Sequence, residues 1–408
     1  MYGNRVGGLS VRITNIRCVQ LEGTLPVEGS YYEERLVMPV DIYDEFRLAG
    51  WPAQEHLPKE ENGRLSISSI FIYVDTDEGI SGIAGPIARV AAFLALRMKE
   101  LLVGQDALAT QKLWDLMYRR AVHGRKGEPM MAISAIDCAL WDLKGKWLNQ
   151  PVYRLLGGPT RDRLPAYASM LGYSLEPDLV RQRVKEFRNL GYTGQKWFFR
   201  YGPSSGREGV KRNVELVRIA RETAGDDYDL MFDAWMSWDV PYTLDMAERL
   251  KEYNPRWIEE PVLPDKIDQM VEITSRSPVP ISGAEHEYTR WGFQEILRHR
   301  ALDIIQPDTM WAGGITEMMN ICTLASVYDT PVIPHGESVA ANVHIIAALP
   351  PNICPLVEYL VKWNQGWQYF LKDPVIPRNG LIELDDRPGL GLVIEESKIE
   401  RQFELSFY

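Results

Sequence analysis

Six ionisable residues close six short apolar runs of this chain at nearly even spacing. Each run is typical of a buried strand, because it is short, apolar and rich in residues that favour β structure. In chain order the six residues are Asp233, Glu259, Glu285, Asp308, His335 and Glu358. The successive gaps are 26, 26, 23, 27 and 23 residues, about the length of a strand, a helix and two loops. The spacing therefore predicts β/α units that each end in a polar side chain.

Eight apolar segments fit the strands of a parallel barrel, and amphipathic helical segments alternate with them. These strands centre on Ala166, Lys196, Met231, Ile258, Ile281, Ile305, Ile333 and Val357. Eight strands over roughly 200 residues favour a barrel over an open sheet. Because barrel strands converge on one mouth, where catalysis takes place, the chain is predicted to be an α/β enzyme with a TIM-like barrel.

At 408 residues the chain is long for one hydrophobic core, so a second domain is expected. Residues 9–21 and 65–75 alternate or run apolar with β-branched residues, which is typical of strands, and helical patterns follow them. We therefore predict a small α+β domain over residues 1–155, the barrel over 156–373, and a tail over 374–408 that folds back on the first domain.

Composition argues against several kinds of partner. The formal charge of −11 argues against nucleic acid and anionic membranes, since both favour a basic surface. No run approaches the ~20 apolar residues that span a bilayer, and the first residues lack the apolar stretch of a signal peptide. The scattered cysteines suit buried thiols better than disulfides or a zinc site; they are Cys18, Cys138, Cys322 and Cys354. We expect a cytoplasmic protein.

Three of the acids are candidates for a metal site. Asp233, Glu259 and Glu285 end consecutive predicted strands, and neighbouring strands lie ~4.8 Å apart. Three carboxylates in register can close on a single ion, and an all-oxygen site with room for water favours Mg²⁺. Any one acid alone is compatible with a solvated strand end. Glu260 follows Glu259 directly, so it is expected to point to the opposite face and to pair outward.

The next two strands end in Asp308 and His335. A carboxylate that holds one imidazole nitrogen fixes the tautomer and leaves the other nitrogen as a general base near neutral pH. Lys196 ends the second strand, where it would face His335 across the ion and support a substrate carboxylate or enolate, or be an ordinary strand-end lysine. Glu358 ends the eighth strand and would either donate a hydrogen bond in its protonated form or pair with an arginine.

Substrate specificity is expected to come from loops around the mouth. Each candidate, taken alone, is also compatible with a solvated loop residue. The candidates in the first domain are Arg35, Arg64, His56, Tyr31 and Tyr32, and those that follow barrel strands are Trp235 and His286.

Taken together, these residues resemble the enolase superfamily and, within it, the mandelate racemase subgroup. The resemblance rests on the segment WIEEP, the three acids, the pair Asp308 and His335, and the tail segment PGLGLVI. It implies a modified TIM barrel covered by an N-terminal α+β capping domain, which the C-terminal tail completes. It also implies an essential Mg²⁺, proton abstraction next to a carboxylate, and a homo-oligomer.

One departure from the subgroup bears on the reaction. Racemases carry Lys-x-Lys at the second strand, whereas this chain has Lys196, Trp197 and Phe198. A racemase needs acid and base on opposite faces of the carbanion, but a syn elimination can use one face. The segment FDAWMSWD also resembles that of sugar-acid dehydratases. We therefore predict that His335 takes the C2 proton of an aldonate or aldarate and that loss of the C3 hydroxyl gives a 2-keto-3-deoxy acid.

Three other interpretations remain at this point. An epimerase or racemase of the same superfamily would use Lys196 as its second base. A metal-free barrel hydrolase would use two of the acids as a catalytic pair. A non-catalytic binding barrel gives no reason for a histidine that an acid positions.

Overall fold

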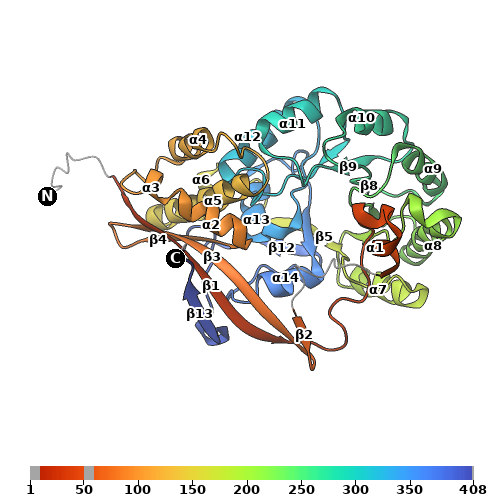
Figure 1. Ribbon diagram of the computed structural model, residues 1–408, viewed down its shortest axis with the longest axis horizontal. Coiled ribbons are helices and arrows are strands. Elements are labelled where there is room, and N and C mark those ends of the chain that lie inside the picture. The colour runs from red at the N-terminus through yellow and green to blue at the C-terminus, as the bar shows by residue number, and fades with distance from the viewer. Residues whose placement is uncertain (1–9, 50–58, 407–408) are drawn as a thin grey trace.

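The computed structural model describes residues 10–49 and 59–406, and within them two β-sheets organise the chain (Figure 1). The first sheet contains β1 (Ile13–Pro26), β2 (Lys59–Glu61), β3 (Arg64–Thr76), β4 (Ser81–Ile87) and β13 (Arg401–Glu404). Its order is β13-β1-β3-β2, with β4 also paired to β3, and every pairing is antiparallel. The last strand of the chain therefore lies beside the first.

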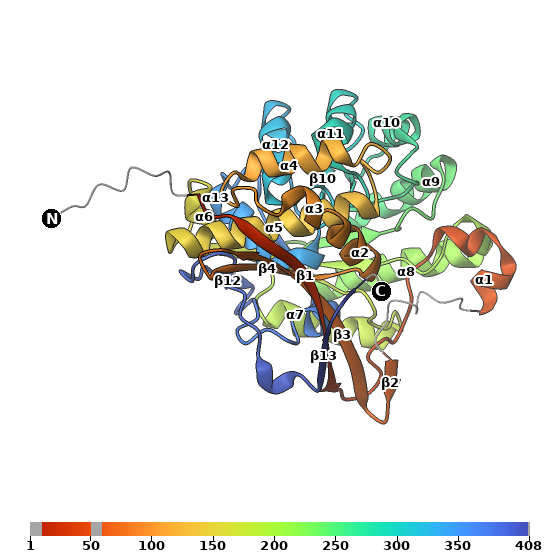
Figure 2. The same ribbon diagram turned by 60° about the vertical axis from the view of Figure 1, so that its left-hand side comes forward.

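Three helices of the N-terminal part contact this sheet: α2 (Arg89–Arg97), α3 (Lys99–Leu102) and α5 (Glu128–Leu148). Helices α4 (Thr110–Arg120) and α6 (Val152–Leu155) pack against α5, whereas α1 (Asp44–Ala49) lies apart from the sheet, near residues 206–224 of the barrel. Helix α5 is buried along most of its length and contacts β4 and α2 of this part as well as a barrel helix, residues 314–327 (Figure 2). It is a core helix, because apolar residues lie on nearly all of its sides.

The second sheet is the barrel. Its strands are β5 (Arg163–Ser169), β6 (Gly194–Phe198), β7 (Asp229–Asp233), β8 (Trp257–Glu259), β9 (Ile281–Gly283), β10 (Ile304–Ile305), β11 (Val357–Leu360) and β12 (Leu381–Glu383). The order is β10-β9-β8-β7-β6-β5-β11, all parallel, and β12 adds an antiparallel pairing to β5. Seven of the eight predicted strands are present; the segment around Ile333 contributes one parallel bridge, from Val332 to Ile305.

The parallel sheet curls until side chains from distant strands meet inside it. Tyr167, Met231, Trp257, Ile333 and Leu356 form one buried cluster. These residues come from both ends of the strand order, so they can only meet if the sheet closes on itself. The predicted barrel is thus confirmed, with a packed interior below its mouth.

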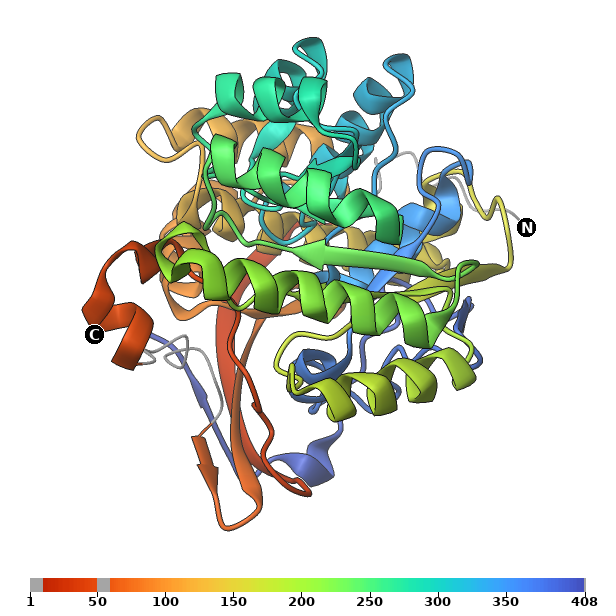
Figure 3. The ribbon, with the colours of Figure 1, turned by 90° about the vertical axis from the view of Figure 1, so that its right-hand side faces the viewer.

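Helices surround the barrel on the outside, and Figure 3 shows α7 to α10 side by side there. They are α7 (Pro177–Asn189), α8 (Gly206–Ala224), α9 (Val240–Leu250), α10 (Ile267–Arg276), α11 (Thr289–Arg298), α12 (Gly314–Val327), α13 (Val339–Ala348) and α14 (Val361–Trp367). Short 3₁₀ helices are η1 (Pro39–Ile42), η3 (Pro203–Ser205), η4 (Lys251–Tyr253), η5 (Gly336–Ser338) and η6 (Glu396–Lys398). In α7, Val180, Val184 and Phe187 are buried at helical spacing and face the sheet.

The C-terminal tail packs on both parts of the molecule. β13 extends the first sheet beside β1, whereas β12 pairs with β5 of the barrel. Between them, the backbone N–H of Leu390 donates to the Asp142 carboxylate of α5 at 2.8 Å. The tail therefore joins the barrel, α5 and the first sheet. The exact boundaries of the three predicted segments stay a prediction.

The four cysteines are buried and free, as expected from their spacing. Across the described ranges, every helix is too short or too polar to cross a bilayer.

Candidate active site

Asp308 and His335 meet at the mouth of the barrel. Asp308 follows β10, and His335 ends the short segment that bridges to β10. The Nδ1 atom of His335 lies 2.8 Å from Asp308 Oδ2, and the other carboxylate oxygen of Asp308 accepts the backbone N–H of Met310 at 2.7 Å. The Nε2 atom of His335 lies 3.5 Å from Glu285 Oε2. The structure thus brings the predicted pair together, with Nδ1 held and Nε2 turned toward another acid.

The charges around His335 favour its protonated form. Burial acts to lower the pKa of the imidazole, but the carboxylates of Glu285 and Asp308 outweigh it and raise the pKa well above its usual value. A cation held by Glu285 would cancel part of this field, because a bound divalent ion is the largest local charge in such a site. His335 would then titrate closer to neutral pH, where a general base is useful.

Lys196 lies in the centre of the barrel, enclosed by carboxylates. Its Nζ atom is 3.2 Å from Asp233 Oδ2 and 2.8 Å from Glu358 Oε1, and it also bonds to Glu259 Oε1. Only 1% of the residue is exposed. Burial acts to lower the pKa of Lys196, yet the three acids raise it well above the usual value. Lys196 is therefore a buried cation that neutralises part of the acidic cluster.

Glu358 differs from the sequence expectation. Its Oε2 accepts the backbone N–H of Gly336 at 2.9 Å, and its ion pair is with Lys196 rather than with an arginine. Burial acts to raise the pKa of Glu358, but the charges of Lys196 and His335 lower it below its usual value. The buried lysine favours the ionised form of Glu358, and its role as a hydrogen-bond donor stays a prediction.

The three predicted metal ligands are divided between two neighbouring clusters. Asp233 and Glu259 share Lys196, and the other oxygen of Glu259 accepts from Trp257 and Gln306, each at 2.8 Å. Glu285 belongs to a second cluster. Within the described residues, two sets of three side chains place their ligand atoms within 4.8 Å of one another: Glu260, Glu285 and His286, and Asp308, His335 and Glu337. The triad of Asp233, Glu259 and Glu285 stays a prediction.

The donor set nevertheless suits a hard cation. The pKa of Asp233 is raised well above its usual value, because burial disfavours the charge and the carboxylates of Glu259 and Glu285 repel it, while Lys196 opposes them only in part. A divalent cation relieves this kind of repulsion. The donors are carboxylate oxygens, which are the ligands that Mg²⁺ prefers. The residues present therefore fit the metal that the sequence predicted.

Glu260 does not point away from the mouth, so that expectation is wrong. The backbone leaves the extended conformation directly after Glu259, and Glu260 has a φ of +40°. Strand alternation therefore no longer applies to it. Its Oε2 atom lies 3.0 Å from Nδ1 of His286. Burial acts to lower the pKa of His286, but Glu260 and Glu285 raise it to about 9.

Aromatic rings form one wall of the mouth. The ring of Trp311 lies 5.1 Å from that of His335 and 5.5 Å from that of His286, and the ring of Trp235 lies 6.0 Å from that of His286. Trp235 also donates its backbone N–H to Asp233 at 2.8 Å. The structure thus places Trp235 and His286, two predicted substrate-binding residues, next to each other, and Trp311 contacts both His286 and the predicted base His335.

A segment of the first domain reaches the mouth, but its arginine is already paired. The backbone N–H of Val37 donates to the carbonyl of Phe199 at 2.8 Å, which docks the segment after β6. Arg35 is buried and binds Asp41 at 2.8 Å. The predicted contact of Arg35 with substrate would have to share the guanidinium with Asp41.

The other candidates of the first domain lie in varied surroundings. Tyr31 donates its hydroxyl to the carbonyl of Lys362, and the ring of Tyr32 lies 6.3 Å from that of Trp363, so both pack near α14. Arg64 begins β3 and is exposed, and its strand partners are Pro26 and Glu61. His56 lies outside the described residues. The substrate-binding roles of these residues stay predictions.

Two functional candidates escaped the sequence analysis. Asn342 is fully buried in α13; it donates to the carbonyl of His335 at 2.7 Å and accepts from the hydroxyl of Thr309 at 2.5 Å. Asn342 thereby connects the segments that carry Asp308 and His335, which form the predicted catalytic dyad. Glu337 belongs to the set that contains Asp308 and His335. An asparagine in the apolar run VAANVHIIAA is a signal that could have been found, since buried polar groups need partners.

Comparisons with known proteins agree with this geometry. Residues 63–157 match the N-terminal domain of the mandelate racemase / muconate lactonizing enzyme family, and residues 179–398 match the enolase C-terminal domain-like family. An L-rhamnonate dehydratase of Saccharopolyspora erythraea is 32% identical over 389 residues, which cover 92% of this chain and 94% of that protein.

Solved structures give the same picture. The rhamnonate dehydratase of Gibberella zeae complexed with Mg superposes with a TM-score of 0.83 at 32% identity, covering 96% of this chain and 95% of that one. The 3,6-anhydro-D-galactonate cycloisomerase of Zobellia galactanivorans superposes with a TM-score of 0.76 at 27% identity, covering 96% and 100%.

Proposed function

The chain belongs to the mandelate racemase / muconate lactonizing enzyme family of the enolase superfamily, and we propose that it is a Mg²⁺-dependent sugar-acid dehydratase. The observation that carries the proposal is the buried pair of Asp308 and His335, whose free imidazole nitrogen turns toward an acid of the mouth. Because relatives are named L-rhamnonate dehydratase, L-rhamnonate and similar aldonates are the first substrates to test. An aldarate is the second class.

Asp233, Glu259 and Glu285 would hold the metal. When bound, Mg²⁺ supplies fixed positive charge where negative charge develops on the substrate carboxylate. Lys196 lies directly beside Asp233 and Glu259, so it adds a second positive charge below the same region. The enzyme then has two sources of positive charge on one side of the substrate and the imidazole on another.

His335 would remove the C2 proton. Asp308 accepts the hydrogen of Nδ1, which leaves the lone pair of Nε2 facing the mouth. Asn342 holds the backbone carbonyl of His335, so the ring keeps its place during the transfer. The electron pair of the C2–H bond forms an enediolate. The protonated His335 or another acid then gives a proton to the C3 hydroxyl, which leaves as water, and the resulting enol tautomerises to a 2-keto-3-deoxy acid.

The surroundings of β6 favour dehydration over racemisation. Phe198 stands where racemases of the family carry their second lysine, and it packs in an apolar cluster with Leu36 and Leu360. Lys196 is enclosed by three carboxylates, which keep it protonated and unable to act as a base. A second base on the face opposite His335 is therefore missing from β6, as a one-sided elimination requires.

A substrate screen tests the proposal. The purified protein with MgCl₂ is incubated with L-rhamnonate, other aldonates and aldarates, and 2-keto-3-deoxy acid is measured. We expect product from at least one aldonate, loss of activity with EDTA, and recovery on adding MgCl₂. Deuterium uptake at C2 with inverted stereochemistry and no keto acid would identify an epimerase instead. Hydrolysis of a glycoside that EDTA does not affect would identify the metal-free alternative.

A further inference from the structure

Glu337 is a third acid–base group at the dyad that the mechanism above leaves without a role. It lies two residues after His335 in η5. Its carboxylate oxygen, a ring nitrogen of His335 and a carboxylate oxygen of Asp308 all lie within 4.8 Å of one another. The side chain of Trp311 hydrogen-bonds to Glu337, and the Trp311 ring also lies 5.1 Å from the His335 ring. Glu337 is therefore held beside the predicted base.

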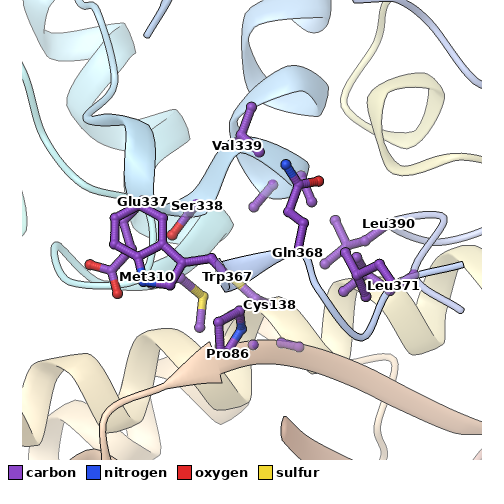
Figure 4. Close-up of a pocket in the computed structure, with 15 residues that line it drawn as sticks. Pro86, Cys138, Met310, Glu337, Ser338, Val339, Trp367, Gln368, Leu371 and Leu390 are labelled. Carbon is purple, nitrogen blue, oxygen red and sulfur yellow. The ribbon is translucent and has the colours of Figure 1, made fainter. Parts of the chain in front are cut away.

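The side chain of Glu337 also reaches open space. It lines a cavity of about 30 Å³ between the first domain, the barrel and the tail. Figure 4 shows Glu337 and Met310 at one end of this cavity, and Leu371 and Leu390 at the other. Most of the residues that line the cavity are apolar; they include Pro86, Val339, Met310, Leu371 and Leu390. Glu337 is partly exposed rather than sealed in the core.

The charges that face Glu337 favour its neutral form. Burial and the carboxylate of Asp308 raise its pKa to about 8, Glu285 adds to this effect, and His335 and the hydrogen bond from Trp311 oppose it. A general acid must carry its proton at the working pH, and pairs of titratable groups with separated pKa values commonly divide acid and base roles. Geometry and environment therefore agree.

We propose that Glu337 is the general acid that protonates the departing C3 hydroxyl. This proposal rests on the proposed dehydratase function. His335 takes the C2 proton, and the electron pair of that bond forms the enediolate. When the C3–O bond breaks, its electron pair stays on oxygen, the Glu337 carboxyl gives its proton to that oxygen, and water leaves. The imidazolium of His335 then returns its proton to the Glu337 carboxylate, which resets both groups.

The placement of the two groups also predicts the stereochemistry. His335 directly precedes the 3₁₀ turn that contains Glu337, so we expect both groups to approach the substrate from one side. The proton taken from C2 and the hydroxyl lost from C3 must then lie on the same face. The elimination is therefore syn.

The variant Glu337→Gln separates the two steps. Glutamine keeps the size and the neutral charge of the protonated acid but cannot release a proton. We expect kcat for dehydration to fall roughly 10²- to 10⁴-fold, the range typical of general acid–base catalysis. In D₂O, recovered substrate should gain deuterium at C2, since His335 still forms the enediolate. A 3-deoxy-3-fluoro analogue, whose leaving group needs no proton, should lose fluoride within about tenfold of the wild-type rate.

The other outcomes contradict the proposal in distinct ways. Wild-type dehydration in Glu337→Gln would assign the acid role to another group. Equal losses of dehydration, C2 exchange and fluoride release, with an unchanged melting temperature, would make Glu337 a positioning residue for His335. If the glutamine variant does not fold, Glu337→Asp must keep the fluoride reaction and lose part of the dehydration rate. A wild type that dehydrates no acid sugar contradicts the proposed function itself.

Discussion

Lys196 of β6 and Glu358 of β11 form a buried ion pair inside the barrel, with 2.8 Å between Nζ and Oε1. Asp233 lies 3.2 Å from the same ammonium. One lysine thus opposes several carboxylates at the base of the mouth. A barrel interior of this kind tolerates its acids only while cations are present, because an unpaired buried charge is costly.

Lys196→Met should therefore destabilise the fold. We expect a loss of about 3–5 kcal/mol in the free energy of unfolding, the usual cost of removing one partner of a buried pair. MgCl₂ should raise the melting temperature of the variant more than that of the wild type, since the metal replaces part of the missing charge. Calorimetry with EDTA or MgCl₂ measures both effects.

The control is Lys211→Met on the surface. Lys211 is largely exposed and lies 4.0 Å from Glu208, so its replacement should change stability by less than about 0.5 kcal/mol. Equal stability of Lys196→Met and the wild type in EDTA would show that the buried acids are protonated or otherwise neutralised without the lysine.

The dyad predicts graded effects on catalysis. His335→Asn should abolish dehydration because the proton acceptor is gone. Asp308→Asn should lower kcat roughly 10²- to 10⁴-fold, since an amide no longer stabilises the imidazolium or holds the required tautomer. Steady-state kinetics of keto-acid formation, with melting temperatures as the folding control, test both. Full turnover by His335→Asn would remove this residue from the chemistry.

Asp142 should be a main support of the tail. Its carboxylate accepts the backbone N–H groups of Ile83 and Leu390, each at 2.8 Å, and pairs with Lys146 at 2.7 Å. Asp142→Ala leaves these donors unsatisfied in the core, so we expect a loss of about 3 kcal/mol. Urea denaturation measures the loss, and limited proteolysis should cut the tail faster. Asp115→Ala, which removes an exposed pair with Arg119, is the control and should be nearly neutral.

His344 predicts a loss of stability in mild acid. Burial lowers the pKa of His344 to about 4, whereas an unfolded histidine titrates near 6.5. Between these pH values the unfolded state binds a proton at His344 that the folded state does not bind. The free energy of unfolding therefore falls as the pH drops from about 6.5 to about 4. The loss from this residue should approach about 3 kcal/mol. Urea titrations of the wild type and His344→Gln across this window should show a shallower pH slope in the variant; identical slopes would contradict the assignment.

Much of the site could be predicted from the chain alone because parallel topology leaves little choice. In a β/α-barrel every strand ends at the same mouth, so a polar residue after an apolar run must lie near the others. Asp308 and His335 follow this rule directly. The missing second lysine at Phe198 could likewise be read from the register of one strand.

The rest depended on contacts between segments far apart in the chain. Glu260 turned toward His286 because its backbone took a φ of +40°, which no alternation pattern contains. Arg35, a predicted substrate-binding residue, forms an ion pair with Asp41.

The sequence by itself determined the barrel, its helices and the identity of the groups at its mouth, because hydrophobic periodicity is a local property. Only the tertiary structure decided which carboxylates share Lys196 and that Glu337 joins Asp308 and His335. Such partnerships, and the pKa values that follow from them, depend on distances and burial that exist only once the chain has folded.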